Sequence, residues 1–215
     1  MKTAFITGAS GGVGLEVAFE LHQAGWQVIG QYRTKPGDVP GITWWKADLL
    51  KPYELPPMSK VHALVHCAGI ANLGRVSETT TEDWEAAMNI NLYAPIALTN
   101  QLLPALRASN GHVVYLNSGA GLRANPNWGA YAASKFAARA WCDALRAEEP
   151  EIRVTSIHPG RIDTPMQQHI VEQEDGVYDP SQYLRASTVA CAVVNVLHTP
   201  NDCDPNEVIL RPRKH

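Results

Sequence analysis

Two side chains able to do chemistry stand four residues apart in the chain, the phenol of Tyr131 and the amine of Lys135. In a helix this spacing places both on one face, within reach of each other or of a shared ligand. A phenol with an ordinary pKa of about 10 is a poor acid near neutral pH. A nearby ammonium group favours the phenolate, which lowers that pKa and makes the phenol a usable proton donor or acceptor. The pair predicts acid–base chemistry, although the same spacing also occurs on ordinary surface helices.

A glycine-rich turn at residues 7–14 is predicted to hold the phosphates of a nucleotide. Its sequence, Thr-Gly-Ala-Ser-Gly-Gly-Val-Gly, joins a β-rich run at Thr3–Thr7 to a helical pattern at Val13–Gln23. Glycines allow a sharp turn and a close approach of phosphate, and the helix N-terminus offers unpaired N–H groups. The spacing differs from the common Gly-x-Gly-x-x-Gly pattern, and a purely structural tight loop is the alternative. The expected cofactor contacts in this turn are Gly8, Ser10, Gly11, Gly12, Val13 and Gly14.

Strand-like and helix-like patterns alternate along the chain. Strands are expected at Thr3–Thr7, Gln27–Tyr32, Ile42–Lys46, Val61–His66, Gly111–Asn117, Ile152–Ile157 and Glu207–Arg211. Helices are expected at Val13–Gln23, Glu82–Ala108, Trp128–Ala147 and Ser187–Leu197. Several strands are apolar throughout, as expected when helices cover both faces of a parallel sheet. The pattern predicts an α/β fold with a single domain over residues 1–215, a Rossmann-type doubly wound parallel sheet flanked by helices on both faces.

Two segments interrupt this alternation. The segment Lys51–Lys60 contains three prolines, so the crossover there cannot be a regular long helix. The segment Thr164–Leu184 is polar and irregular, and it follows the expected strand Ile152–Ile157. It would therefore lie beyond the carboxyl end of that strand, where open α/β sheets bind ligands. We interpret residues 164–184 as a substrate loop or lid, with a plain surface loop as the alternative. Thr164 could also N-cap a following helix that has Pro165 at its first position.

The bulk properties limit the function classes. The chain has 215 residues, 45% of them hydrophobic and 18% charged, so it can bury a large core. A net charge of −3 gives no electrostatic reason to expect nucleic acid or a membrane as a partner, and no apolar run is long enough to span a bilayer. The cysteines Cys67, Cys142, Cys191 and Cys203 lack zinc-type spacing, so no metal site is predicted. Free thiols suit a reducing compartment, and a cytoplasmic location is expected.

In its motifs and their order the chain resembles the short-chain dehydrogenase/reductase family over nearly its whole length. The turn at residues 7–14 is similar to the family's cofactor turn. The other matching motifs are Asp48-Leu49, Cys67-Ala68-Gly69, the helix residue Asn91, Ser118 thirteen residues before Tyr131, Lys135, and Pro159-Gly160-Arg161-Ile162-Asp163-Thr164. The cofactor contacts implied by this resemblance are Asp48, Leu49, Cys67, Ala68, Gly69, Tyr131, Lys135, Pro159, Gly160, Ile162, Thr164 and Met166. His66-Cys67 replaces the family's Asn-Asn pair, so other hydrogen bonds are expected to tie the sheet together there.

The resemblance implies hydride transfer between a nicotinamide and a carbonyl or alcohol carbon. Tyr131 would exchange the proton, and Ser118 would hold the substrate oxygen with its hydroxyl group. Lys135 would lower the pKa of Tyr131 and could hydrogen-bond the nicotinamide ribose. Asn91 is expected to hold a water that links Lys135 to solvent. Because Asn91 falls on an apolar helical stripe, a purely structural hydrogen-bond partner is the alternative.

The choice between the two nicotinamide cofactors depends on the residues that follow the second strand. An acidic side chain there would bind the ribose 2′-hydroxyl of NAD and repel a 2′-phosphate. The chain has no carboxylate in this stretch, whereas Arg33 can clamp a phosphate and Thr34 can add a hydroxyl donor. NADP(H) is therefore predicted over NAD(H), even though Gly11 stands where NADP-preferring relatives often carry a second basic residue.

The substrate is less well defined than the reaction. The stretch Asp163–Gln167 is similar to sepiapterin and benzil reductases of the family, and the ending Asn206–Pro212 to 3-hydroxy-acid dehydrogenases. The expected pocket residues are Ser118, Ala120, Trp128, Tyr131 and Met166. The leading hypothesis is an NADP-dependent carbonyl reductase or alcohol dehydrogenase acting on a small molecule. A non-catalytic NADP(H)-binding regulator or redox sensor is the alternative. A sugar-nucleotide epimerase is disfavoured by the short C-terminal part, and the family implies a homodimer or homotetramer.

Overall fold

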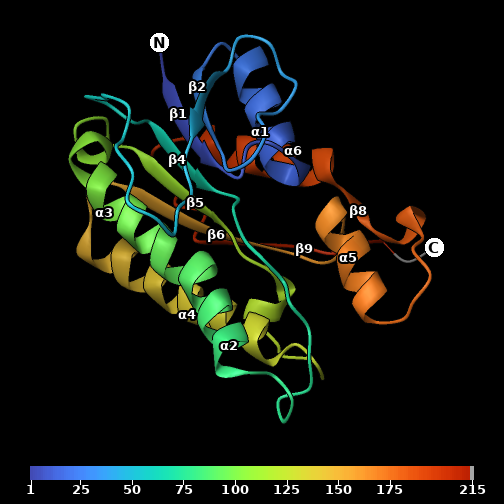
Figure 1. Ribbon diagram of the computed structural model, residues 1–215. Coiled ribbons are helices and arrows are strands. Elements are labelled where there is room, and N and C mark those ends of the chain that lie inside the picture. The colour runs from blue at the N-terminus through green and yellow to red at the C-terminus, as the bar shows by residue number, and fades with distance from the viewer. Residues whose placement is uncertain (214–215) are drawn as a thin grey trace.

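A seven-stranded parallel sheet forms the centre of the computed structural model, which describes residues 1–213 (Figure 1). The strands are β1 (Thr3–Thr7), β2 (Gln27–Tyr32), β3 (Thr43–Lys46), β4 (Ala63–His66), β5 (His112–Leu116), β6 (Arg153–Pro159) and β9 (Glu207–Leu210). Their order across the sheet is β3-β2-β1-β4-β5-β6-β9, and each neighbouring pair is parallel. The chain reverses its direction of travel across the sheet between β1 and β4. The predicted strands and the doubly wound fold are confirmed.

Helices cover both faces of this sheet (Figure 1). Helices α1 (Gly12–Gln23) and α6 (Ala186–Leu197) pack on one face. Helices α3 (Ala94–Arg107) and α4 (Gly129–Glu148) pack on the other, with α2 (Thr81–Met88) at their end. All four residues of β4 are buried, which explains why the sequence of this strand is apolar rather than alternating.

The helix expected over 82–108 is divided by a π-helical segment, Asn89–Tyr93, which lies between α2 and α3. Pro95 at the start of α3 has no N–H to give to the carbonyl group four residues before it. A single wide turn of this kind is common at functional sites. Here it places Asn91, which is completely buried, on the side of the helix that faces β5 and α4.

The two irregular segments of the sequence differ in the structure. Residues 47–62, between β3 and β4, contain no helix, as predicted. Residues 164–184 are more regular than predicted, because helix α5 (Pro165–Gln173) forms there. The hydroxyl of Thr164 accepts the N–H of Gln167 at 3.3 Å and so caps this helix, and Ile170 and Val171 are buried. Two short strands, β7 (Ile162–Asp163) and β8 (Leu184–Arg185), pair in parallel and close the segment at both ends.

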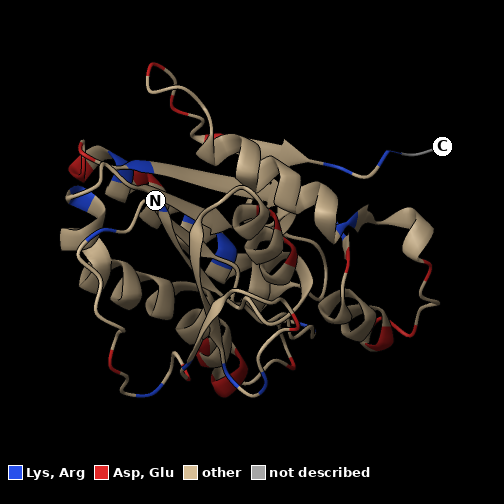
Figure 2. Cartoon of the chain, turned by 90° about the horizontal axis from the view of Figure 1, so that it is seen from above, with Lys and Arg blue, Asp and Glu red and all other residues tan. Residues whose placement is uncertain are grey.

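Charged residues of both signs are interspersed around the periphery of the molecule (Figure 2). Within residues 1–213, none of the helices combines the length and the apolar character that a bilayer crossing requires.

Candidate active site

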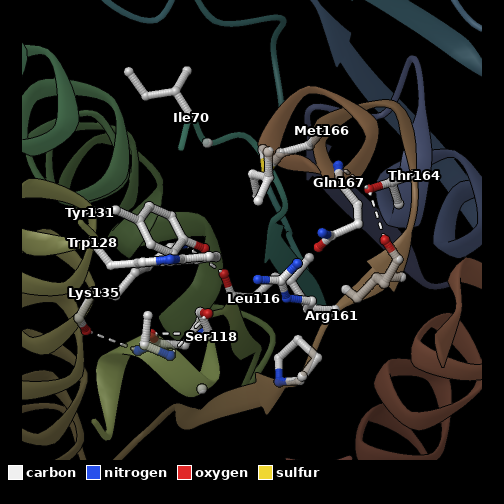
Figure 3. Close-up of a pocket in the computed structure, with 18 of the residues that line it drawn as sticks. Ile70, Leu116, Ser118, Trp128, Tyr131, Lys135, Arg161, Thr164, Met166 and Gln167 are labelled. Carbon is white, nitrogen blue, oxygen red and sulfur yellow. Dashed lines mark hydrogen bonds between the residues drawn. The ribbon is translucent and has the colours of Figure 1, made fainter. Parts of the chain in front are cut away.

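A cleft of about 210 Å³ opens at the carboxyl ends of the central strands (Figure 3). Residues from the ends of β4, β5 and β6 line it, together with the start of α4 and the first turns of α5. The lining side chains include Ser118, Tyr131 and Lys135 on one side and Thr164, Met166 and Gln167 on the other. The cleft lies next to the point where the strand order reverses between β1 and β4, which is where open α/β sheets bind their ligands.

The glycine-rich turn lies between β1 and α1, and two of its glycines, Gly8 and Gly14, have no space for a side chain. Gly8 has a φ of +62°, and a Cβ there would lie 2.8 Å from the backbone nitrogen of Ala68. A Cβ on Gly14 would lie 2.3 Å from the carbonyl oxygen of Gly8, so α1 packs directly on the turn. A Cβ on Gly12 would lie 3.4 Å from the Thr164 side chain, so the turn and the start of α5 face each other.

The N-terminus of α1 fits a bound phosphate. Gly11 is the N-cap residue, has no side chain to cap the helix, and the first turn carries no acidic residue. The N–H groups at this end therefore stay available, and the positive end of the helix dipole is uncompensated. The geometry of residues 8–14 suits the pyrophosphate of a dinucleotide, which the sequence predicts.

Tyr131 and Ser118 face each other across a narrow part of the cleft. Tyr131 is buried at 7% exposure, and the edge of the Trp128 ring packs on it with centroids 5.7 Å apart. Burial raises the pKa of Tyr131, and a hydrogen bond with the Ser118 side chain opposes this shift. The net direction is the reverse of the acidification expected from the sequence. In the free protein the phenol is therefore protonated and can donate.

Lys135 reaches the same place from the next turn of α4 but does not bond to Tyr131. Its Nζ donates to the carbonyl of Leu116 at 3.0 Å and to the hydroxyl of Tyr115 at 3.1 Å, and it lies 5.8 Å from the Tyr131 ring centroid. Burial lowers the pKa of Lys135 to about 7. From the sequence, Lys135 is expected to lower the pKa of Tyr131 through its positive charge. Burial opposes this effect, because it also disfavours the charged form of the lysine.

Asn91 lies behind the cleft rather than in its lining. Its side-chain amide accepts the N–H of Ile70 and donates to the carbonyl of Ile70, both at 3.0 Å, and it also donates to the hydroxyl of Ser134 at 3.0 Å. These are the structural partners considered as the alternative for this residue. The backbone carbonyl oxygen of Asn91 accepts a short hydrogen bond from the hydroxyl of Tyr115. A water held by Asn91 stays a prediction.

The cofactor contacts expected from the sequence fall into three places. Seven of the residues line the cleft beside Tyr131 and Lys135, namely Cys67, Gly69, Pro159, Gly160, Ile162, Thr164 and Met166. Ala68 lies against Gly8, and the glycine turn borders the start of α5. Arg33 and Asp48 line a second cavity together with Lys46 and Lys51, whereas Thr34 is exposed beside it and Leu49 is half-buried. The expected substrate residues Ala120 and Trp128 also line the cleft.

The departure at His66-Cys67 is compensated by other groups. The hydroxyl of Thr7 accepts the backbone N–H groups of Cys67 and Ala68, at 3.1 and 3.2 Å, and so ties β1 to the end of β4. His66 is buried and its Nε2 lies 2.9 Å from the hydroxyl of Thr99. Burial lowers the pKa of His66 to about 3, so its ring is neutral.

Several residues that line the cleft were not assigned a role from the sequence. Among them are Ile70, Asn117, Arg161, Gln167 and Ile170. Arg161 lies 5.7 Å from the Trp128 ring centroid and donates to both carboxylate oxygens of Glu174. Figure 3 shows the side chains of Arg161 and Gln167 directed into the cleft. Gln167 and Ile170 are three residues apart and share one face of α5. Predicting a helix over residues 165–173 would therefore have placed both on the same side.

The reversal of strand order and the cleft beside it are typical of the nucleotide-binding α/β class of proteins. The family model for short chain dehydrogenase matches residues 55–175. The uncharacterized oxidoreductase YbbO of Escherichia coli strain K12 is 36% identical over 180 residues, which cover 76% of this chain and 66% of that protein. The chain belongs to the short-chain dehydrogenase family.

Further relatives cover the whole chain. Dehydrogenase/reductase SDR family member 11 of Mus musculus is 29% identical, covering 98% of this chain and 94% of that protein. The structure of a short chain dehydrogenase from Shigella flexneri complexed with NADP has a TM-score of 0.81 and 26% identity, over 98% of this chain and 95% of that one. An alcohol dehydrogenase from Thermococcus sibiricus shares the fold with a TM-score of 0.84 at 23% identity, over 100% of this chain and 99% of that one.

Proposed function

We propose that the chain is an NADP(H)-dependent carbonyl reductase or alcohol dehydrogenase acting on a small molecule. The observation that carries the proposal is the convergence of Ser118, Tyr131 and Lys135 in one cleft that faces a phosphate-binding turn. A binding module needs none of these three side chains. A bound nicotinamide would supply or accept the hydride, and the residues of the chain would manage the proton and the substrate oxygen.

In the direction of reduction, negative charge develops on the carbonyl oxygen of the substrate. The hydroxyl of Ser118 would donate a hydrogen bond to that oxygen, and the phenol of Tyr131 would give it a proton. Because burial keeps Tyr131 protonated in the free protein, it begins the reaction as an acid. Lys135 would place positive charge near the resulting phenolate and so make the proton transfer easier.

The preference for NADP(H) rests on the end of β2. The stretch Gln31–Thr34 has no acidic side chain that would select NAD, and Gln31 is buried and bridges the N–H of Gly8 and the carbonyl of Ala47. Beyond it, Arg33, Lys46 and Lys51 line the second cavity and offer positive charge to a 2′-phosphate, with Asp48 and Glu54 as opposing carboxylates. The Shigella flexneri relative that was solved with NADP supports the same preference.

Helix α5 and the loop that follows it are proposed to act as the substrate lid. Gln173 bonds the backbone of Leu73 and Ala71, at 2.8 and 3.3 Å, and so connects α5 to the loop on the far side of the cleft. Ile170 packs in one cluster with Tyr131 and Trp128. A substrate must pass between these elements to reach Tyr131, so its shape would be selected there.

The proposal is tested by incubating the protein with NADPH and a panel of aldehydes, diketones and pterin-like ketones, and following the consumption of NADPH. Wild type is expected to turn over at least one compound. Tyr131→Phe is expected to reduce kcat by about 10²- to 10⁴-fold with little change in the Kd for NADPH. Tight NADPH binding without turnover of any compound would favour the regulator instead.

The cofactor preference has its own experiment. The Kd for NADPH is expected to be clearly lower than that for NADH, and Arg33→Ala should reduce the difference about tenfold or more. Arg75→Ala, at an exposed arginine far along the chain from the second cavity, serves as the control. An unchanged ratio of the two constants in Arg33→Ala would rule out this role for Arg33.

A further inference from the structure

Lys135 brings a positive charge into the interior, where few groups can stabilise it. Lys135 is 4% exposed, and none of the ion pairs within residues 1–213 includes it. The titratable groups that surround it, on β4, β5 and α4, are His66, Cys67, Tyr115, Tyr131 and Cys142. Burial lowers the pKa of His66 to about 3 and raises the pKa values of Cys67 and Cys142 to about 12. With the pKa values of both tyrosines also raised, all five groups are uncharged near neutral pH.

The charge of Lys135 therefore depends on oxygen dipoles, and the protein supplies two. One is the carbonyl of Leu116 at 3.0 Å and the other is the hydroxyl of Tyr115 at 3.1 Å. The Tyr115 ring also lies under the ammonium group, with its centroid 4.6 Å from Nζ. Tyr115 thus provides one of the two acceptors and a favourable ring face.

The orientation of the Tyr115 hydroxyl is fixed from its other side. Tyr115 is 1% exposed, and its proton is donated to the carbonyl oxygen of Asn91 in a short hydrogen bond. In a regular α-helix that carbonyl would accept the N–H of residue 95, but Pro95 has none. Because Pro95 cannot donate, this α-helical hydrogen bond is missing, and the backbone carbonyl of Asn91 accepts the hydroxyl of Tyr115. With its proton directed there, the oxygen of Tyr115 presents a lone pair to Lys135.

We propose that Tyr115 is a positioning residue for Lys135, whose ammonium group its hydroxyl holds in place and keeps charged through an anchor on the carbonyl of Asn91. The consequence for catalysis rests on the proposed function, in which Lys135 assists Tyr131. The consequence for the charge of Lys135 does not depend on that function.

Tyr115→Phe tests the hydroxyl group alone. It removes the hydroxyl that accepts from Lys135 and keeps the ring face under the ammonium group. Loss of one acceptor disfavours the charged form, so the titration midpoint of Lys135 should fall by about one pH unit. The matched control is Tyr93→Phe. It also removes a tyrosine hydroxyl, but from a side chain of the π-helical segment that is 54% exposed.

The midpoint is measured by NMR on protein with labelled lysine side chains, and Lys135→Met identifies the signal. In turnover assays Tyr115→Phe should lower kcat about fivefold near neutral pH and shift the pH profile of kcat, with KM for the carbonyl compound changed less than about twofold. A wild-type protein without turnover would overturn the proposed function, and the NMR titration would still decide the role of Tyr115.

A fall in melting temperature with an unchanged Lys135 midpoint would mean that Tyr115 is only structural, and the proposal would be wrong. An unchanged midpoint with unchanged stability would also overturn it. If Tyr115→Phe does not fold, Pro95→Ala gives the carbonyl of Asn91 a competing N–H donor and leaves Tyr115 in place. A smaller fall of the same midpoint is then expected, and no change would remove Asn91 as the anchor.

Discussion

The two walls of the cleft hold their polar side chains in different ways. The wall built by β5 and α4, with Asn91 behind it, is hydrogen-bonded throughout its centre, because Asn91, Asn117 and Lys135 all have partners within the protein. In the wall built by α5, the side-chain nitrogen Nε2 of Gln167 has no hydrogen-bond partner among residues 1–213, although Gln167 is only 4% exposed. Met166 beside it is 39% exposed.

This difference matches two different tasks. Proton transfer requires fixed positions, and a network of satisfied hydrogen bonds provides them. An unpaired buried amide costs free energy unless a ligand pairs with it, so the α5 wall is the place where ligands of different chemistry can be told apart. The comparison predicts that equal changes on the two walls have unequal effects.

The largest effect on stability is expected from Asn91→Leu in the bonded wall. It would leave the backbone groups of Ile70, the hydroxyl of Ser134 and a closely packed site without their polar partner. A loss of about 3 kcal/mol in the free energy of unfolding is expected, measured by urea denaturation. Asn100→Leu, at an exposed position of α3, should be nearly neutral. Equal losses in the two variants would break the comparison.

The second prediction concerns the pH dependence of stability. The pKa of His66 is about 3 in the folded protein and near 6.5 when unfolded, so in that window only the unfolded chain binds the proton. The free energy of unfolding should therefore fall as the pH is lowered from about 6.5 to 3, by about 1.4 kcal/mol per pH unit for each such proton.

Replacing His66 removes one of these protons. Denaturation curves of His66→Asn should show a shallower pH slope, with buried His112 contributing to what remains. His169→Asn, an exposed histidine on α5, should keep the wild-type slope. Identical slopes in all three proteins would show that His66 is not neutral when folded.

A smaller effect is expected at the tie between α5 and the opposite loop. Gln173→Leu removes the bonds to Leu73 and Ala71, each worth about 1 kcal/mol at most because they are partly exposed. The variant should remain folded and show a higher KM, since the lid would close less often. Gln168→Leu on the exposed face of α5 is the control. Steady-state kinetics are measured on both variants. An equal KM in Gln173→Leu and Gln168→Leu would show that the hydrogen bonds of Gln173 have no role in ligand binding.

The smallest effect is expected from Trp128→Ala. Its ring packs between Tyr131 and Arg161, at the mouth of the proposed substrate site. Ratios of kcat/KM between bulky and small carbonyl compounds should change about three- to tenfold, with an unchanged Kd for NADPH. A larger change in cofactor binding than in substrate preference would place Trp128 outside the substrate pocket.

The parts of the fold and site that depend on spacing along one element could be predicted from the sequence. Tyr131 and Lys135 share a helix face, and the glycine turn lies between β1 and α1, so local pattern was sufficient for both. From the sequence, the segment of helix α5 is interpreted as an irregular loop because it is polar, and only the pair Thr164-Pro165 suggests the start of a helix. The stability of α5 depends on the Thr164 cap and on Ile170 packing against the cleft.

The contacts between elements could not be predicted in the same way. The hydrogen bond between Tyr115 and Asn91 depends on how β5 packs against the π-helical segment, and the sequence periodicity does not predict that segment. The direction of the Tyr131 pKa was predicted wrongly, because the spacing to Lys135 shows a neighbour but not the depth of burial. Gln167 and Arg161 meet in the cleft only after the segments that carry them have folded.

Cys67 gives the cleft a chemical property that bears on the regulator hypothesis. Its thiol lines the cleft, and burial raises its pKa to about 12. The thiolate, not the neutral thiol, is the nucleophile that attacks a peroxide, so oxidants that reach this sulfur should react with it slowly. A protein that reported oxidation through a sulfur at this position would need the opposite environment. The raised pKa instead makes the Cys67 thiol a weak nucleophile towards electrophilic carbonyl compounds in the cleft.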